Sequence, residues 1–143
     1  AVSVIMPCLN AAAFIERALQ SVNAQTMGDY ELLVVDNGST DKSVHIVEGQ
    51  QSPHIRLLHE PTAGVSHARN RGLEAARGRY VAFLDADCTV GENWVERILD
   101  AHRGEYLTVG GVISGNCATG SARSARPPAR VMTMEITKAN WAD

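Results

Sequence analysis

The sequence predicts an α/β fold with a mainly parallel sheet and helices on both of its faces. Short apolar segments alternate along the chain with segments that repeat their apolar residues at helical spacing. Such alternation is typical of parallel sheets whose strands are joined by helices. The apolar segments are also nearly continuous, as expected for strands that are buried on both faces. Ligands of such sheets bind beyond the carboxyl ends of the strands.

The strands are placed from apolar segments that are rich in β-branched residues. The first four are expected at residues 2–6, 30–35, 55–58 and 80–84. A fifth is expected at 107–113, and the segment VMTMEIT favours a further strand at 131–137. The basic, proline-containing segment 123–130 is expected to be a loop or linker.

A helix is expected after each of the first four strands. Asn10 is a suitable N-cap for the first helix, because its side chain can accept a hydrogen bond from an N–H group of the first turn. The second helix can be capped by Ser39, Thr40 or Asp41. The other two helices are expected at about 65–77 and 92–102.

Length and composition indicate one ordinary domain over residues 1–143, since 45% hydrophobic residues suffice for a core. The net charge of −3 argues against nucleic acid as a partner. Three scattered cysteines without a CxxC pair argue against a disulfide framework or a zinc site, and favour a reducing, cytoplasmic compartment. No apolar run is long enough to form a membrane segment in this chain. Any attachment to the inner face of a membrane would use other parts of a longer protein.

The most specific chemical signal is the pair of acids in VAFLDAD. In an extended segment Asp85 and Asp87 would point to the same side, about 6.5 to 7 Å apart, with Ala86 facing away. Mg²⁺ typically accepts one or two carboxylates, with phosphates and water as its other ligands. The pair therefore favours a divalent metal, Mg²⁺ or Mn²⁺, that holds a diphosphate. The alternative is a solvated turn that caps the next helix.

A third acid, Asp36, ends the second expected strand, so it should lie at the same rim as the pair. The alternative is that Asp36 only opens the turn DNGST, since Asp, Asn and Gly favour turns for local reasons. The turn after the first strand, PCLNAAAF, contains no glycine. This excludes the glycine-rich loops of nicotinamide dehydrogenases and P-loop nucleotidases.

Four arginines before the fourth strand supply positive charge close to these acids: Arg69, Arg71, Arg77 and Arg79. A spacing of two residues turns a helix by about 200°, so they cannot share one face. We expect one or two of them to point toward the site.

Three segments together resemble the signature blocks of the inverting GT-A glycosyltransferases of family 2. They are SVIMPCLN, LLVVDNGSTD and AGVSHARNRGLEAARGRYVAFLDADC, in that order, and the resemblance covers about residues 2–113. It implies a Rossmann-like GT-A nucleotide-diphospho-sugar transferase fold that is truncated at its C-terminus. The donor-binding half would be about residues 1–115, and an incomplete acceptor-side region would be about 116–143.

The resemblance also implies roles for single residues. Pro7 and Leu9 would line the base pocket, Asp36 would accept a hydrogen bond from the base, and Arg69 would lie near the nucleotide. Asp85 would approach the ribose or the metal, Asp87 would coordinate the metal, and Ala86 would lie between them in the binding site. Two positions depart from the family's pattern: Thr62 stands where Asn is frequent, and Cys88 where a third acid is frequent.

The expected activity is transfer of a sugar from a nucleotide-diphosphate sugar, with UDP favoured, to a saccharide, lipid or protein hydroxyl with inversion. The general base would come from a later segment beyond Asp143, so this chain alone should bind nucleotide weakly and transfer no sugar. Two alternatives stay open. One is a non-catalytic scaffold that binds sugar nucleotides. The other is a haloacid-dehalogenase-like phosphatase, because DADCT fits DxDxT with Asp85 as nucleophile and Asp87 as acid.

Overall fold

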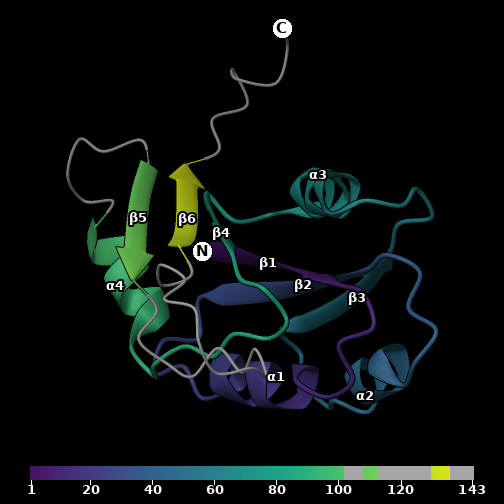
Figure 1. Ribbon diagram of the computed structural model, residues 1–143. Helices are drawn as coiled ribbons and strands as arrows, with labels where there is room; N and C mark the ends of the chain where they lie inside the picture. Colours follow the sequence, from purple (N-terminus) through teal and green to yellow (C-terminus); the bar gives the residue numbers. More distant parts are fainter. Residues whose placement is uncertain (102–107, 113–129, 136–143) are drawn as a thin grey trace, which may run out of the picture.

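The computed structural model describes residues 1–101, 108–112 and 130–135. Six strands form one sheet in the order β3-β2-β1-β4-β6-β5 (Figure 1). The strands are β1 (Val2–Cys8), β2 (Tyr30–Asp36), β3 (Ile55–His59), β4 (Tyr80–Phe83), β5 (Thr108–Val112) and β6 (Arg130–Glu135). The helices are α1 (Ile15–Asn23), α2 (Ser43–Glu48), α3 (Val65–Ala75) and α4 (Trp94–Ala101).

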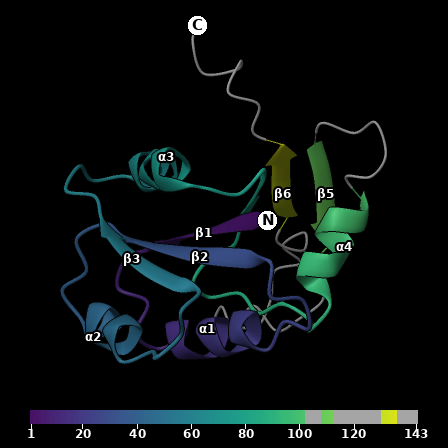
Figure 2. The same cartoon turned by 180° about the vertical axis from the view of Figure 1, so that it is seen from behind.

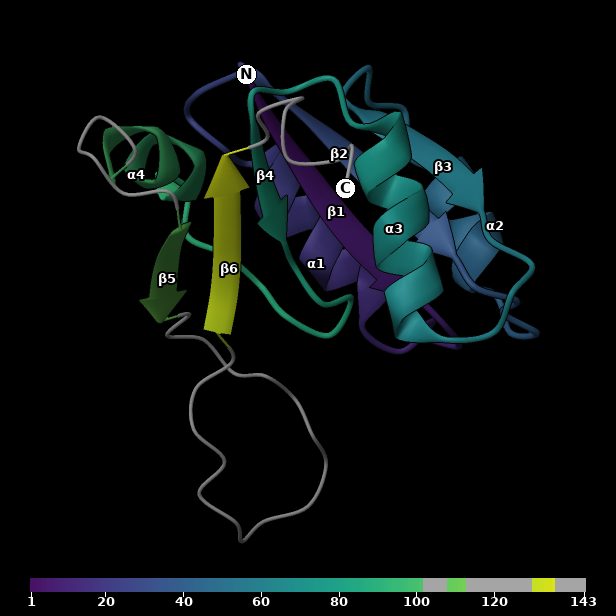
Figure 3. The same cartoon turned by 90° about the horizontal axis from the view of Figure 1, so that it is seen from above.

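Strands β1 to β4 are parallel to one another, and β6 runs antiparallel to both β4 and β5. Connections between parallel strands are almost always right-handed. The chain moves outward from β1 to β3 and then returns to β4 on the other side of β1. The helix of the return step must therefore cover the opposite face. Figures 2 and 3 show this arrangement: α1 and α2 lie under one face, and α3 lies across the other.

The expected fold class, a mainly parallel sheet with helices on both faces, is confirmed. All six expected strands are present, with bounds that differ from the expected ones by one or two residues. The expected linker at 123–130 lies outside the described residues except for Arg130, which begins β6.

The expected cap of the first helix is wrong. Helix α1 begins at Ile15, five residues after Asn10, and its N-cap residue Phe14 makes no side-chain cap hydrogen bond. Asn10 instead has a left-handed backbone, with φ of 50°, and its side chain bonds a different loop. At the second helix the N-cap is Lys42, whereas Asp41, one of the three candidates, accepts a hydrogen bond from the N–H of Ser43 at 2.8 Å.

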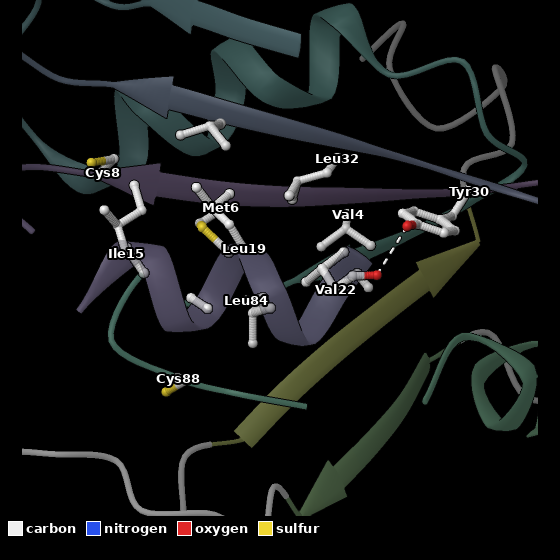
Figure 4. Packing of buried hydrophobic residues seen from close by; sticks show 14 of the residues in the cluster. Val4, Met6, Cys8, Ile15, Leu19, Val22, Tyr30, Leu32, Leu84 and Cys88 are labelled. Carbon is white, nitrogen blue, oxygen red and sulfur yellow. Dashed lines mark hydrogen bonds between the residues drawn. The ribbon is translucent and has the colours of Figure 1, made fainter. Parts of the chain in front are cut away.

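Most of the core lies between the sheet and α1. Side chains of β1 alternate between the two faces, so Val4 and Met6 pack toward α1 while Ile5 packs toward α3. Figure 4 shows Ile15, Leu19 and Val22 of α1 against the first group. The hydroxyl of Tyr30 donates to the carbonyl of Val22 at 2.9 Å, which joins the start of β2 to the end of α1 (Figure 4).

A polar network on the α3 side fixes the connection between α3 and β4. Glu31 accepts hydrogen bonds from the Ser3 hydroxyl at 2.7 Å, the backbone N–H of Arg77 at 2.7 Å and the guanidinium of Arg56 at 2.8 Å. The N–H of Gly78 donates in turn to the Ser3 hydroxyl at 2.8 Å. Burial raises the pKa of Glu31, but these hydrogen bonds outweigh burial, so its pKa lies below the ordinary value of 4.5.

Replacing Glu31 with Gln should lower the free energy of unfolding by about 1 to 3 kcal/mol at neutral pH, because the charged acceptor of the network is lost. A carboxyl whose pKa falls on folding stabilises the fold above its unfolded pKa, and this contribution disappears as the pH falls through the folded pKa. The loss in Glu31→Gln should therefore be full at pH 7 and shrink below about pH 4.5. Urea titrations at several pH values check this. Glu48→Gln, at the exposed end of α2, should leave the free energy of unfolding unchanged. A loss in Glu31→Gln that stays constant down to pH 3 would contradict the assignment.

Candidate functional site

The carboxyl ends of the parallel strands meet at one rim of the sheet. The register pairs Cys8 with Asp36 and Asp36 with His59, so these three residues lie side by side. On the other side of β1, Phe83 of β4 pairs with Ile5. The winding of the sheet reverses between β1 and β4, and such a reversal opens a crevice where ligands of open α/β sheets bind. The predicted site residues all belong to this rim.

Asp36 is nearly buried, with 6% of its surface exposed. Its carboxylate accepts hydrogen bonds from the N–H groups of Gly38 at 3.3 Å and Ser39 at 3.1 Å, and it lies 3.4 Å from Nδ1 of His59. Gly38 permits this tight turn because its φ is 87°, a conformation that L side chains rarely adopt. The local turn role of Asp36 is thus real. A carboxylate has about four acceptor positions, so further acceptor capacity remains for a ligand.

Asn10 joins the loop after β1 to the loop after β2. Its side-chain oxygen accepts hydrogen bonds from the N–H groups of Thr40 at 2.8 Å and Asp41 at 3.3 Å. In return, Ser39 accepts from the N–H of Asn10 at 3.0 Å, and Asp41 accepts from the N–H of Ala12 at 3.0 Å. These bonds hold Leu9, which is 58% exposed, at the rim beside the end of β2.

Asn37 joins the second loop to a third, a role that no local sequence pattern indicates. Its backbone N–H donates to the carbonyl of Cys8 at 2.9 Å. Its side-chain amide donates to the carbonyls of Glu60 at 2.9 Å and Thr62 at 2.7 Å, and its oxygen accepts from the N–H of Gly64 at 2.8 Å. The residue is buried. Asn37 therefore fixes the loop between β3 and α3 against the end of β2.

Replacing Asn37 with Asp should loosen this loop, because a carboxylate can still accept from Gly64 but cannot donate to the two carbonyls. We expect a loss of about 1 to 3 kcal/mol in stability and faster amide exchange at Gly64, measured by urea unfolding and hydrogen exchange. Asn23→Asp introduces the same charge at an exposed position at the end of α1 and should alter neither the stability nor the exchange at Gly64. Unchanged exchange at Gly64 in Asn37→Asp would show that the bonds of Asn37 do not hold the loop.

The acidic pair follows β4 in a turn, which corrects the expectation of an extended segment. Strand β4 ends at Phe83, and the N–H of Cys88 donates to the carbonyl of Asp85 at 3.0 Å. Ala86 and Cys88 face the core, whereas Asp85 is exposed and Asp87 is half-buried. Alternate residues of this segment thus bury apolar side chains beneath the sheet, and the two carboxylates lie on its other side. Since the methyl group of Ala86 is in the core, any ligand contact of this residue would involve its backbone.

One of the four predicted arginines reaches the acidic turn. The Nη2 atom of Arg69 lies 3.4 Å from Oδ1 of Asp85. Arg71 instead pairs with Glu74 at 3.7 Å, and Arg79 lies over the ring of Tyr80. Among the contacts of the described residues, Arg69 is thus the arginine that reaches the acidic turn.

The two carboxylates fit a cation that takes its other ligands from a substrate. Within the described part of the chain, no group of three His, Cys, Asp or Glu residues gathers as a metal site. Asp85 and Asp87 provide two hard oxygen donors at an open turn, a donor set that suits Mg²⁺ or Mn²⁺ completed by phosphate oxygens. The sulfur of Cys88 donates to Oδ1 of Asp87 at 3.4 Å, so a thiol stands beside the pair in place of a third carboxylate.

The environment of the cysteine at the rim disfavours its deprotonated form. Burial raises the pKa of the Cys8 thiol above its ordinary value of 9.0, and the nearby charge of Asp36 raises it further, although hydrogen bonds with Ser43 and Ser39 act in the opposite direction. Because the thiolate is the reactive form, covalent chemistry at Cys8 is disfavoured. Among the described residues, the rim thus offers carboxylates and the guanidinium of Arg69.

Residues 3–141 match the family described as glycosyl transferase family 2. The chain belongs to this family. Among curated relatives it is 43% identical to the "Uncharacterized glycosyltransferase YibD" of Escherichia coli over 99 residues, which are 68% of this chain and 29% of YibD. The family 2 chain therefore spans less than a third of that relative. Membership also favours the glycosyltransferase interpretation of DADCT over the phosphatase alternative.

Solved structures of glycosyltransferases share the fold. S. aureus TarS 1-349 in complex with UDP-GlcNAc is 25% identical with a TM-score of 0.73, over 86% of this chain and 37% of TarS. The mannosyltransferase PcManGT from Pyrobaculum calidifontis, in complex with GDP-Man and Mn²⁺, is 28% identical with a TM-score of 0.72, over 78% of this chain and 35% of that protein. The family 2 chain thus has a GT-A fold.

Of the acids considered for a general base, Glu105 and Asp143 lie outside the described residues, and Glu135 is described only as the last residue of β6. Within the described helices, none has the length and apolar composition that a membrane crossing requires.

Proposed function

We propose that this chain forms the donor-binding part of a family 2 glycosyltransferase that uses a nucleotide-diphosphate sugar, with a UDP-linked donor preferred. The sugar would pass to an acceptor hydroxyl, of a saccharide, lipid or protein, with inversion at the sugar carbon. The observation that carries the proposal is the position of Asp36 and the acidic turn of Asp85 and Asp87 at one rim, on either side of β1, in a family 2 chain.

Asp36 would select the base. Its carboxylate is held by the N–H groups of Gly38 and Ser39, so it is a fixed hydrogen-bond acceptor. Uracil, thymine and guanine carry a ring N–H that such an acceptor can bind, whereas cytosine and adenine do not. Exposed Leu9 and neighbouring Pro7 would contact the flat face of the base. The UDP and GDP donors named for TarS and PcManGT both satisfy this requirement.

The acidic turn would serve the diphosphate. Asp87, with Asp85, would hold a divalent cation, which when bound supplies Lewis-acid stabilisation of the leaving diphosphate. Arg69 lies against the same turn and adds positive charge. Transfer with inversion also needs a general base within about 2.6 to 3.2 Å of the acceptor hydroxyl. We propose that this carboxylate comes from outside the described residues.

Calorimetric titration with nucleotides tests the proposal. UDP, dTDP and GDP should bind in the presence of Mn²⁺, and UDP should bind most tightly. CDP is the matched control, because it differs from UDP at the edge that Asp36 would recognise. Equal binding of CDP and UDP would contradict the role of Asp36, and UDP binding that is unaffected by Mn²⁺ would contradict the role of the acidic turn. Binding without sugar transfer by the whole protein would favour the scaffold alternative.

A further inference from the structure

Arg69 is held at the acidic turn by the packing of α3. Ala68, its neighbour, is fully buried against Ile5 and Val81 of the sheet. One turn later, a Cβ atom on Gly72 would lie 2.5 Å from Cγ2 of Ile5, so α3 lies as close to the sheet as a glycine permits. The Arg69 side chain then extends over the ring of Phe83 in β4, with its central carbon 5.7 Å from the ring centroid. The guanidinium therefore has a defined position at the end of β4.

The ion pair that Arg69 forms there is weak as a structural contact. Its single contact with Asp85 is 3.4 Å long, and the two side chains are 41% and 55% exposed. Pairs of this kind contribute little to stability. In addition, Nε of Arg69 is buried and has no hydrogen-bond partner among the described residues. Because Nε is inaccessible in this position of the side chain, it can gain a partner only if the guanidinium moves away from Asp85.

Both observations describe an arginine whose hydrogen bonding is incomplete in the ligand-free protein. The guanidinium is positive, and the carboxylate next to it is one of only two at the turn. A divalent cation bound by Asp85 and Asp87 would compete with Arg69 for the same carboxylate and would be repelled by its charge. A diphosphate would be attracted by both cations at once. The effect of Arg69 on the two ligands is thus opposite in sign.

We infer, on the basis of the proposed function, that Arg69 is the counter-ion of Asp85 in the ligand-free protein and couples the two ligands of the site. It weakens binding of a divalent cation alone and strengthens binding of the nucleoside diphosphate. The cation and the diphosphate therefore bind well only together. Because coupling between two ligands is reciprocal, the factor by which Mn²⁺ raises the affinity for UDP equals the factor by which UDP raises the affinity for Mn²⁺.

Replacement of Arg69 with Gln tests this inference. The control is Arg71→Gln, which removes the same charge from the same helix. Mn²⁺ alone is titrated by electron paramagnetic resonance, and UDP is titrated by calorimetry with and without Mn²⁺. In Arg69→Gln we expect the affinity for Mn²⁺ alone to rise by about threefold to tenfold, and the affinity for UDP with Mn²⁺ to fall by about tenfold. The affinity for uridine, which has no phosphate, should not change. Arg71→Gln should leave all three affinities as they are.

An unchanged or lower affinity for Mn²⁺ alone in Arg69→Gln would overturn the inference, even if UDP binding fell. Arg69→Lys provides a second test, since it keeps the charge: its affinity for Mn²⁺ alone should stay close to that of the parent chain, and a rise equal to that of Arg69→Gln would also overturn the inference. Failure of the parent chain to bind UDP with Mn²⁺ is a separate result, which would contradict the proposed function itself.

Discussion

Asp87→Asn is expected to lower the Mn²⁺-dependent affinity for UDP by about tenfold or more, on the order of 1 to 3 kcal/mol, without loss of folding. The substitution keeps the volume of the side chain and removes one of the two carboxylates of the acidic turn. Asp87 is half-buried beside Cys88, so its position is better defined than that of exposed Asp85. The measurement is a calorimetric titration with UDP in the presence and absence of Mn²⁺.

The control is Asp29→Asn, which removes a carboxylate at the opposite edge of the sheet. Asp29 pairs with the amino terminus of Ala1 at 2.9 Å and precedes β2, whereas the site lies beyond the carboxyl ends of the strands. The Asp29→Asn variant should therefore bind UDP as tightly as the parent chain. If Asp87→Asn bound UDP with Mn²⁺ as tightly as the parent, Asp87 would not hold the cation. A fall in affinity that was equal with and without Mn²⁺ would show a role in nucleotide binding that does not involve the metal.

Gly78→Ala is expected to cause the largest loss of stability, about 2 to 3 kcal/mol. The connection between α3 and β4 passes over the start of β1, and a Cβ atom on Gly78 would lie 2.6 Å from the backbone nitrogen of Ser3 and 2.9 Å from the carbonyl oxygen of Ala1. Backbone atoms of a central strand cannot move aside cheaply. A shift of Gly78 would also break its hydrogen bond to the Ser3 hydroxyl and disturb the Glu31 network.

Urea denaturation measures this loss, and Gly28→Ala is the matched control. No atom lies within 4 Å of a Cβ built on Gly28, so alanine there should be neutral or stabilise the fold by up to about 1 kcal/mol through the unfolded state. Equal stability of Gly78→Ala and the parent would mean that the connection can move away from β1 without cost.

The strands and the layers could be predicted because they follow from local patterns. Continuous apolar segments mark buried parallel strands, and the order of strands and helices leaves few topologies once crossovers are right-handed. The rim residues Asp36 and Asp85 followed from the same reasoning, since Asp36 ends β2 and Asp85 lies two residues beyond the end of β4. The arrangement of the candidate site was predictable to this extent.

The details that sequence analysis missed depend on contacts between loops. Asn10 has the chemistry of a helix cap, but its side chain instead accepts hydrogen bonds from the N–H groups of Thr40 and Asp41, about thirty residues away. The bonds of Asn37 to the β3–α3 loop likewise join residues more than twenty positions apart. The turn after Asp85 is closed by a hydrogen bond from the N–H of Cys88 to the carbonyl of Asp85, with Ala86 and Cys88 in the core. Such pairings depend on the packed fold, so a local pattern does not reveal them.

A crystal structure of the chain with UDP and Mn²⁺ would test the central claim most directly, with anomalous diffraction used to locate the manganese. We predict a manganese peak at coordination distance from Asp87, about 2.0 to 2.2 Å from a carboxylate oxygen, bridged to the diphosphate of UDP. The ring N–H of uracil should lie within hydrogen-bond distance of Asp36. A manganese peak away from the acidic turn, or a uracil ring that does not contact Asp36, would contradict the proposed donor site.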